Sequence, residues 1–201
     1  SVLAAPLAAQ DDTTATDETT AEATTTDAPA NDPAAVNMGE EVDENGHPIA
    51  QQPHVGQQYM REESGDWIVR CLKTEDGNDP CQLYQLLEDA DGNAVAEISI
   101  VALEGGQAAA GATIVAPLGT LLTEQLTMRI DGGTARRFPF TACNQGGCFS
   151  RIGFTGEDVA AFKRGAAATL RLVPLAAPDQ EVVLNVSLTG FTAGFDSLAA
   201  E

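Results

Sequence analysis

Core-forming side chains are unevenly distributed along this chain of 201 residues. The only Trp, all seven Phe and all four Cys lie within residues 66–201. Residues 10–64 are instead rich in Ala, Thr, Asp, Glu, Pro and Gln. Such a segment buries too little apolar surface to offset the entropy lost on ordering it. The sequence therefore predicts a disordered, acidic Ala/Thr-rich linker over residues 10–64 and one folded domain over residues 65–201.

The N-terminal end has a different composition from the linker. Residues 1–9 are apolar, rich in Ala and end in small residues, which is typical of the last part of a secretory signal peptide. An ordinary Ala-rich terminus is the alternative. No later segment reaches the roughly 18 consecutive apolar residues that a membrane span needs, so no transmembrane segment is expected in the domain.

The chain is strongly acidic, with a formal net charge of −20. Residues 1–65 carry thirteen acids and one base, and residues 66–201 carry seventeen acids and nine bases. Nucleic-acid binding is disfavoured, because it draws much of its affinity from cationic contacts to phosphate. A generic anionic membrane surface is disfavoured for the same reason. The charge of the linker is expected to serve solubility and self-repulsion.

Four cysteines allow three disulfide connectivities, and local pairing is the simplest. Cys71 and Cys81 lie at the facing ends of two apolar runs, while Cys143 and Cys148 flank a loop that contains a Gly pair. Closing loops of about 11 and about 6 residues stabilises a fold by roughly 2 to 3 kcal/mol each when the bridge is unstrained. Structural disulfides need an oxidising compartment, so we expect a periplasmic, outer-surface or secreted protein.

Zinc binding is the alternative role for these cysteines. Zinc sites favour Cys-x(2–4)-Cys spacings, often with His. Only the second cysteine pair has such a spacing, and both histidines, His47 and His54, lie in the predicted linker. An EF-hand loop starting at the acidic turn 89–93 would need Gly at its sixth position and Glu at its twelfth, where the sequence has Ala94 and Ile100, so no metal site is expected.

Short alternating runs separated by turn residues predict an all-β, antiparallel domain, either a sandwich or a partly closed barrel. One short helix is expected from Thr155, which suits a helix N-cap, to Gly165, which suits a helix end. The segment 190–198 reads as a closing turn or a further short helix. The predicted strands cover residues 66–73, 81–87, 94–102, 113–115, 125–130, 135–143, 148–154, 168–173 and 181–188.

The domain offers little that is typical of catalysis. It contains no histidine, which removes the commonest general base and every nucleophile that depends on one. The glycine pairs at 105–106 and 132–133 do not match a phosphate-binding loop. The spacing of Glu97, Glu104 and Glu124 gives no support to a catalytic carboxylate pair. We therefore expect a non-enzymatic protein without a cofactor.

Arginines supply the one candidate contact surface. Arg136 and Arg137 are adjacent, and with Arg129 and Arg151 they are predicted to line one face of neighbouring strands. Such a face suits an acidic protein or glycan partner. The alternative is that these charges hold an acidic domain together or guard an edge strand.

Several stretches of the domain, in order and spacing over nearly all of residues 65–198, resemble the invasion-associated locus B family of exported bacterial proteins. The resemblance implies an export signal, an immunoglobulin-like β-sandwich, a periplasmic or outer-surface location and, in pathogens, a link with host-cell association. It supplies no catalytic motif. The matching stretches are Gly65-Asp66-Trp67-Ile68-Val69-Arg70-Cys71 with Cys81, Pro117-Leu118-Gly119-Thr120-Leu121-Leu122, Ile130-Asp131-Gly132-Gly133, Phe140-Thr141-Ala142-Cys143, Gly147-Cys148-Phe149 and Val186-Ser187-Leu188-Thr189-Gly190-Phe191-Thr192-Ala193.

Three hypotheses about function follow. The first is an envelope protein whose β-domain contacts another protein or a cell-wall component. The second is a surface adhesin or invasion factor, and the third is a periplasmic binder of a small molecule or glycan. Protease access on intact cells separates the second from the first, and a ligand-induced melting shift identifies the third.

Overall fold

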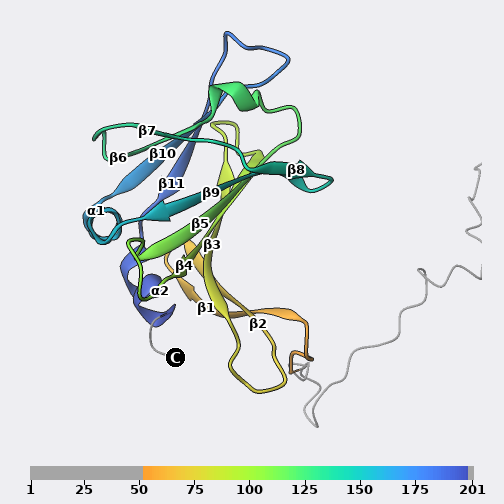
Figure 1. Ribbon diagram of the computed structural model, residues 1–201, viewed down its shortest axis with the longest axis vertical. Coiled ribbons are helices and arrows are strands. Elements are labelled where there is room, and N and C mark those ends of the chain that lie inside the picture. The colour runs from red at the N-terminus through yellow and green to blue at the C-terminus, as the bar shows by residue number, and fades with distance from the viewer. Residues whose placement is uncertain (1–51, 199–201) are drawn as a thin grey trace, which may run out of the picture. The chain divides into compact units, whose positions relative to one another are not determined.

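The computed structural model describes residues 52–198, which form two antiparallel sheets (Figure 1). The seven-stranded sheet contains, in spatial order, β1 (Gln58–Ser64), β2 (Trp67–Leu72), β3 (Cys81–Glu88), β4 (Ala94–Ala102), β5 (Ala110–Ala116), β9 (Gly147–Phe154) and β8 (Ala142–Asn144). The four-stranded sheet contains β11 (Val182–Ser187), β10 (Ala167–Leu172), β6 (Leu126–Ile130) and β7 (Arg136–Phe138). The shared core between them confirms the prediction of an all-β antiparallel sandwich.

Alternation along the strands separates the core from the outer faces. In β2, Trp67, Val69 and Cys71 are buried, and in β11 Leu184 and Val186 are buried, with less buried residues between them. Because successive side chains of a strand point to opposite sides, each sheet turns one apolar face toward the other. Burial of these inward faces provides the main driving force for the fold.

Helix α1 (Gly156–Arg164) begins and ends where the sequence predicts. The Thr155 hydroxyl accepts a hydrogen bond from Asp158 N, and the Asp158 carboxylate accepts one from Thr155 N, which forms a capping box. Acids lie in the first turn and Lys163 and Arg164 in the last, as the helix dipole favours. Phe162, fully buried, anchors the helix to the core.

A second helix, α2 (Phe191–Leu198), forms in the segment 190–198, for which the sequence predicts either a closing turn or a further short helix. The domain therefore has two α-helices rather than one. Phe191 and Phe195 lie four residues apart on its buried face. The Phe191 ring contacts Trp67 edge-on at 5.5 Å and stacks on Phe162 at 5.3 Å. A helix this short is not stable in isolation. Aromatic contacts with the rest of the domain stabilise it, each contributing about 0.5 to 1.5 kcal/mol beyond the burial of apolar area.

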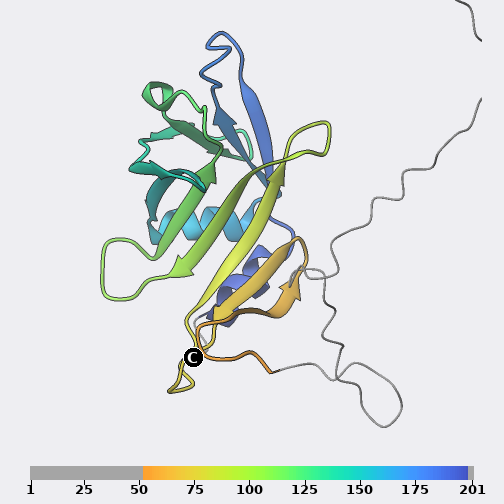
Figure 2. The ribbon, with the colours of Figure 1, turned by 90° about the vertical axis from the view of Figure 1, so that its right-hand side faces the viewer.

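A close backbone approach sets the start of α2. Gly190 has a φ of +83°, and a Cβ there would lie 1.9 Å from the carbonyl oxygen of Ser64. Gly65, in the turn between β1 and β2, has a φ of +60°, and a Cβ there would lie 2.5 Å from Thr189 O. Glycine at both positions therefore lets the β1–β2 turn touch the segment before the helix. In Figure 2 the gold β1–β2 hairpin lies beside α2.

Strand β1 corrects the predicted boundary between linker and domain. Composition predicts a linker over residues 58–64, but these residues pair with β2 along the edge of the seven-stranded sheet. Tyr59 Oη donates to Asp79, and Arg61 donates to the carbonyl and hydroxyl oxygens of Ser197. These long-range contacts order a polar strand that its composition does not predict. The rest of the predicted linker and residues 1–9 lie outside the described residues.

The predicted strand 135–143 is also corrected, because it divides between the sheets. β7 belongs to the four-stranded sheet and β8 to the seven-stranded sheet. Pro139 lies between them, and proline has no N–H to donate to a ladder. Its carbonyl oxygen instead accepts a hydrogen bond from the buried Ser150 hydroxyl. The chain therefore crosses from one sheet to the other at this proline.

One buried amide joins the two sheets. Gln85 on β3 is 7% exposed and lies among the core residues. Its Oε1 accepts from Ser187 N at 2.9 Å, and its Nε2 donates to Ser187 O and to Asp66 O, both at 3.1 Å. Trp67 Nε1 donates to the same Ser187 oxygen at 2.8 Å. These bonds satisfy backbone groups of β11 where that strand has no neighbouring strand on one side.

Within residues 52–198, neither helix has the length and apolar character needed to cross a bilayer.

Candidate binding site on the four-stranded sheet

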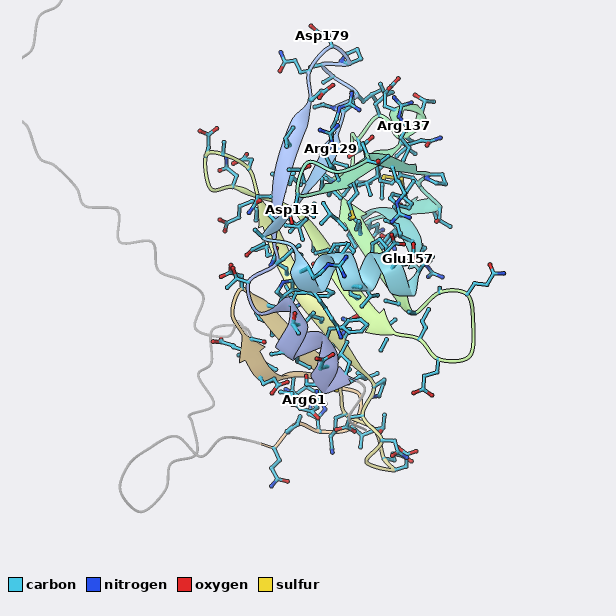
Figure 3. The ribbon with its side chains drawn as sticks, turned by 90° about the vertical axis from the view of Figure 1, so that its left-hand side faces the viewer. Arg61, Arg129, Asp131, Arg137, Glu157 and Asp179 are labelled. Carbon is cyan, nitrogen blue, oxygen red and sulfur yellow. A yellow bond between two sulfur atoms is a disulfide. The ribbon has the colours of Figure 1, made fainter. Side chains whose placement is uncertain are left out.

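The outer side of the four-stranded sheet carries three arginines. Leu126 and Met128 of β6 are buried, so Thr127 and Arg129 between and after them point outward. Thr127 is opposite Arg137 of β7 and also opposite Arg171 of β10. We call the surface formed by Arg129, Arg137 and Arg171 the arginine face. Figure 3, which views the molecule from the side of this sheet, labels two of its members, Arg129 and Arg137.

The three charges are not equally available. Arg171 forms an ion pair with Glu181 of the same hairpin, and this hydrogen bond raises the pKa of Arg171 and lowers the pKa of Glu181. Glu124 adds a weaker electrostatic contribution to Arg171. Arg129 and Arg137 are exposed and make no ion pair with any residue of the described range 52–198. They are therefore the cations of this face that remain open to a partner.

A buried hydroxyl lies at the centre of the face. Thr127 Oγ1 is inaccessible to solvent and has no hydrogen-bond partner among the described residues. Unsatisfied buried polar groups are uncommon in folded proteins. Thr127 lies between Arg137 and Arg171 in one cross-strand row, where neighbouring strands are about 4.8 Å apart. Threonine and arginine side chains in one cross-strand row are a donor set that suits a carboxylate, sulfate or phosphate.

The predicted set of four arginines does not share one face. Arg136 is opposite the buried Met128 and turns toward α1, where its Nη2 lies 2.8 Å from Asp158 Oδ1. Arg151 belongs to β9 of the other sheet, opposite Thr113. Arg129 and Arg137 do lie on the same outer face, and Arg171 joins them. Sequence reasoning missed Arg171, although the alternation Leu170-Arg171-Leu172 on β10 signals an outward arginine.

The Arg136–Asp158 pair connects β7 to the first turn of α1. Burial acts to raise the pKa of Asp158, but hydrogen bonds from Thr155 and Arg136 outweigh it and leave this pKa below its usual value. The Arg136 guanidinium also lies over the Phe138 ring, 5.5 Å from its centroid. Among the residues that the structure describes, Arg136 therefore has an ion pair that Arg129, Arg137 and Arg151 do not have.

A pocket of about 340 Å³ lies between the β6–β7 hairpin and α1, which we call the β6–α1 pocket. Its wall combines apolar side chains with two arginines and two aspartates. The lining residues are Met128, Ile130, Asp131, Gly133, Thr134, Arg136, Phe138, Asp158, Ala161, Arg164 and Gly165.

The cysteines form two local disulfides. Cys71 is bonded to Cys81 and Cys143 to Cys148, which is the local pairing that the sequence favours. Each bridge joins residues directly opposite each other, in β2–β3 and in β8–β9. The bridges indicate an oxidising, non-cytoplasmic compartment. Residues 52–198 contain no free thiol and no cluster of three His, Cys, Asp or Glu side chains arranged to hold a metal ion.

The sequence of this domain matches a known protein family. The sequence model described as "Invasion associated locus B (IalB) protein" matches residues 67–199. The chain belongs to the invasion associated locus B family. Family members with 27% identity over 146 residues include invasion protein B homologs of Brucella abortus strain 2308 and of Brucella abortus biovar 1 strain 9-941. Each match covers 72% of this chain and 82% of the relative.

A solved structure shares the fold. The crystal structure of invasion associated protein B from Bartonella henselae superposes with a TM-score of 0.59 at 24% sequence identity. The match covers 69% of this chain and 94% of that protein. The likeness therefore extends over nearly the whole of the Bartonella protein and concerns the β-sandwich.

Proposed function

We propose that this protein is a non-enzymatic component of the bacterial cell envelope whose arginine face binds an acidic surface of another envelope protein or of a cell-wall polymer. The observation that carries the proposal is the pair Arg129 and Arg137, exposed and without ion pairs in the described range, on one open sheet face. The whole chain has a net charge of −20, and yet none of the described acids pairs with Arg129 or Arg137.

Charge complementarity favours an acidic partner over other classes. Guanidinium groups form bidentate hydrogen bonds to carboxylates, and they steer oppositely charged surfaces together. A polyanion as long as a nucleic acid would also meet the repulsion of the remaining acids, which outnumber the bases by 30 to 10. A local acidic patch on a protein or a glycan meets the arginine face without that penalty.

The residue inventory supports a role without catalysis. Both histidines of the chain, His47 and His54, precede the first strand, so a general base of this type is not offered by the sandwich. All four cysteines are consumed by disulfides. The Arg136–Asp158 pair joins β7 to the capping box of α1, which is a structural role.

A role in host-cell association is the second candidate, and the family supports it. The Brucella relatives are named invasion protein B homologs and the Bartonella structure is named an invasion associated protein. Under this alternative the acidic partner belongs to a host surface. Protease digestion of intact cells separates the two, because a surface-exposed domain is cleaved and a periplasmic one is protected until the outer membrane is opened.

Capture from an envelope extract tests the proposal. The bait is the full chain, compared with the double variant Arg129→Ser/Arg137→Ser and the control Arg151→Ser on the other sheet. We expect wild type and control to retain the same acidic component, released by raised salt because the contact is electrostatic. The double variant is expected to lose it. Equal capture by all three baits refutes the assignment of the arginine face.

A further inference from the structure

We propose that the β6–α1 pocket is a second binding site, independent of the arginine face, and that it takes a medium-chain aliphatic carboxylate. The alkyl chain lies against Met128, Ile130 and Phe138, and the carboxylate faces Arg164 at the rim. The site opens between β6–β7 and α1, so it lies away from the outward row of Arg129, Arg137 and Arg171.

The floor of the pocket is apolar. Met128 is only 4% exposed and belongs to the main core. Ile130 and Phe138 are half-buried and pack against that core, and Ala161 adds a small apolar surface from α1. An unbranched, adaptable side chain such as Met fits alkyl groups of varied shape. An apolar pocket with a few convergent polar groups is the usual form of a small-molecule site, and about 340 Å³ falls at the lower end of the usual size range.

The acids of the pocket are already occupied. The Asp131 carboxylate accepts hydrogen bonds from the N–H groups of Ala166 and Ala167 at 3.0 to 3.1 Å. The Asp158 carboxylate accepts from Thr155 in the capping box and pairs with Arg136. Both carboxylates are therefore held by the fold, and neither is offered to a ligand as a free acceptor.

The cations of the pocket still have donors to give. Arg164 is exposed, and no hydrogen bond or ion pair joins its side chain to another residue in the part of the chain that the structure describes. Arg136 uses Nη2 for Asp158, and the planar guanidinium presents five N–H donors in all. A ligand that fits must therefore bring acceptor oxygens at one end and an apolar body at the other. A carboxylate on an alkyl chain has this composition.

Calorimetric titration of the full chain with sodium octanoate, below its micellar range, tests the proposal. We expect saturable binding at one site, and about tenfold weaker binding of hexanoate because two fewer CH₂ groups are buried. Arg164→Gln is expected to weaken octanoate at least about tenfold, since a charge-assisted contact is lost. Octanol, which lacks the carboxylate, is expected to bind wild type and Arg164→Gln alike.

Control variants make the result decisive. Arg151→Gln removes the same charge from the outer side of the other sheet and is expected to leave octanoate binding unchanged, as is Arg129→Ser/Arg137→Ser. Ala161→Phe, on the α1 side of the pocket, fills the space and is expected to abolish binding while thermal unfolding stays cooperative. Absence of saturable octanoate binding to the wild type overturns the proposal. So does equal weakening by Arg164→Gln and Arg151→Gln, or octanoate binding that survives in a folded Ala161→Phe.

Discussion

Replacing Gln85 by Ala should separate the contribution of the inter-sheet amide from that of general packing. The side chain makes three hydrogen bonds, to Ser187 N, Ser187 O and Asp66 O. At a net contribution of about 1 kcal/mol each, their loss lowers the free energy of unfolding by about 3 kcal/mol. For a domain of this size that corresponds to a fall in Tm of about 6 to 12 °C. Urea and thermal unfolding, followed by circular dichroism, measure both quantities.

A matched change on the same strand is the control. Gln82 also lies on β3, opposite Arg70, and no hydrogen bond of its side chain to a residue of the range 52–198 is found. Gln82→Ala is therefore expected to change stability by no more than about 0.5 kcal/mol. If Gln85→Ala and Gln82→Ala have the same unfolding midpoint, the amide does not link the sheets in the way described.

The variant Gln85→Glu adds a pH signature. Its ionised carboxylate would face the carbonyl oxygens of Asp66 and Ser187 in the core, which raises its folded-state pKa above the value of about 4.3 in the unfolded chain. The unfolded state then releases its proton first, so stability falls as pH rises from about 4.3 through the folded pKa. We expect the deficit against wild type to be smaller at pH 4 than at pH 8. A deficit independent of pH would show that the carboxylate is not buried against these two carbonyl oxygens.

Three further changes test other parts of the fold. Thr155→Ala removes the N-cap of α1 and should lower the free energy of unfolding by about 1 kcal/mol, measured in urea. Gly190→Ala should prevent stable folding, because its Cβ would lie 1.9 Å from Ser64 O. The control is Gly92→Ala, because Gly92 has a similar φ of +81° but no atom near the position of a Cβ. This control variant is expected to remain folded and to unfold cooperatively on heating. The hydrogen bonds from Thr74 N and Tyr59 Oη hold the pKa of Asp79 well below its usual value. The ionised Asp79 therefore stabilises the fold fully above the unfolded-state pKa of about 3.9, and this contribution is lost as pH falls through the folded-state pKa. The deficit of Asp79→Asn, measured by its urea midpoint, should therefore shrink below about pH 4, and a constant deficit contradicts this.

Local patterns predicted the parts of the fold that depend on local physics. Alternation predicted strands such as β2 and β11, and the residue pattern around Thr155 predicted α1 and its ends. β1 was missed because its polar residues are ordered by pairing with β2 and by contacts to Asp79 and Ser197, which are distant in sequence. α2 stayed open because aromatic contacts with Trp67 and Phe162, rather than its own sequence, hold it.

The candidate site was predicted only in part. Arg136 and Arg137 are neighbours on one strand, so strict alternation already implies that they point to opposite sides. Arg151 was grouped with them because sequence does not reveal which strands share a sheet. The position of Arg171 opposite Thr127 depends on the register of β10 against β6, two strands separated in the chain by β7, β8, β9 and α1. Composition alone gives no access to that register.

Site-specific photo-crosslinking in living cells tests the arginine face most directly. The crosslinker replaces Thr169, which is exposed, lies opposite Arg129 and has the same outward orientation. The control position is Thr113, opposite Arg151 on the other sheet. We expect a discrete adduct with an acidic envelope component from position 169, absent from position 113 and suppressed by Arg129→Ser/Arg137→Ser. Adducts of equal yield from both positions, or an adduct at 169 that survives the double substitution, would contradict it.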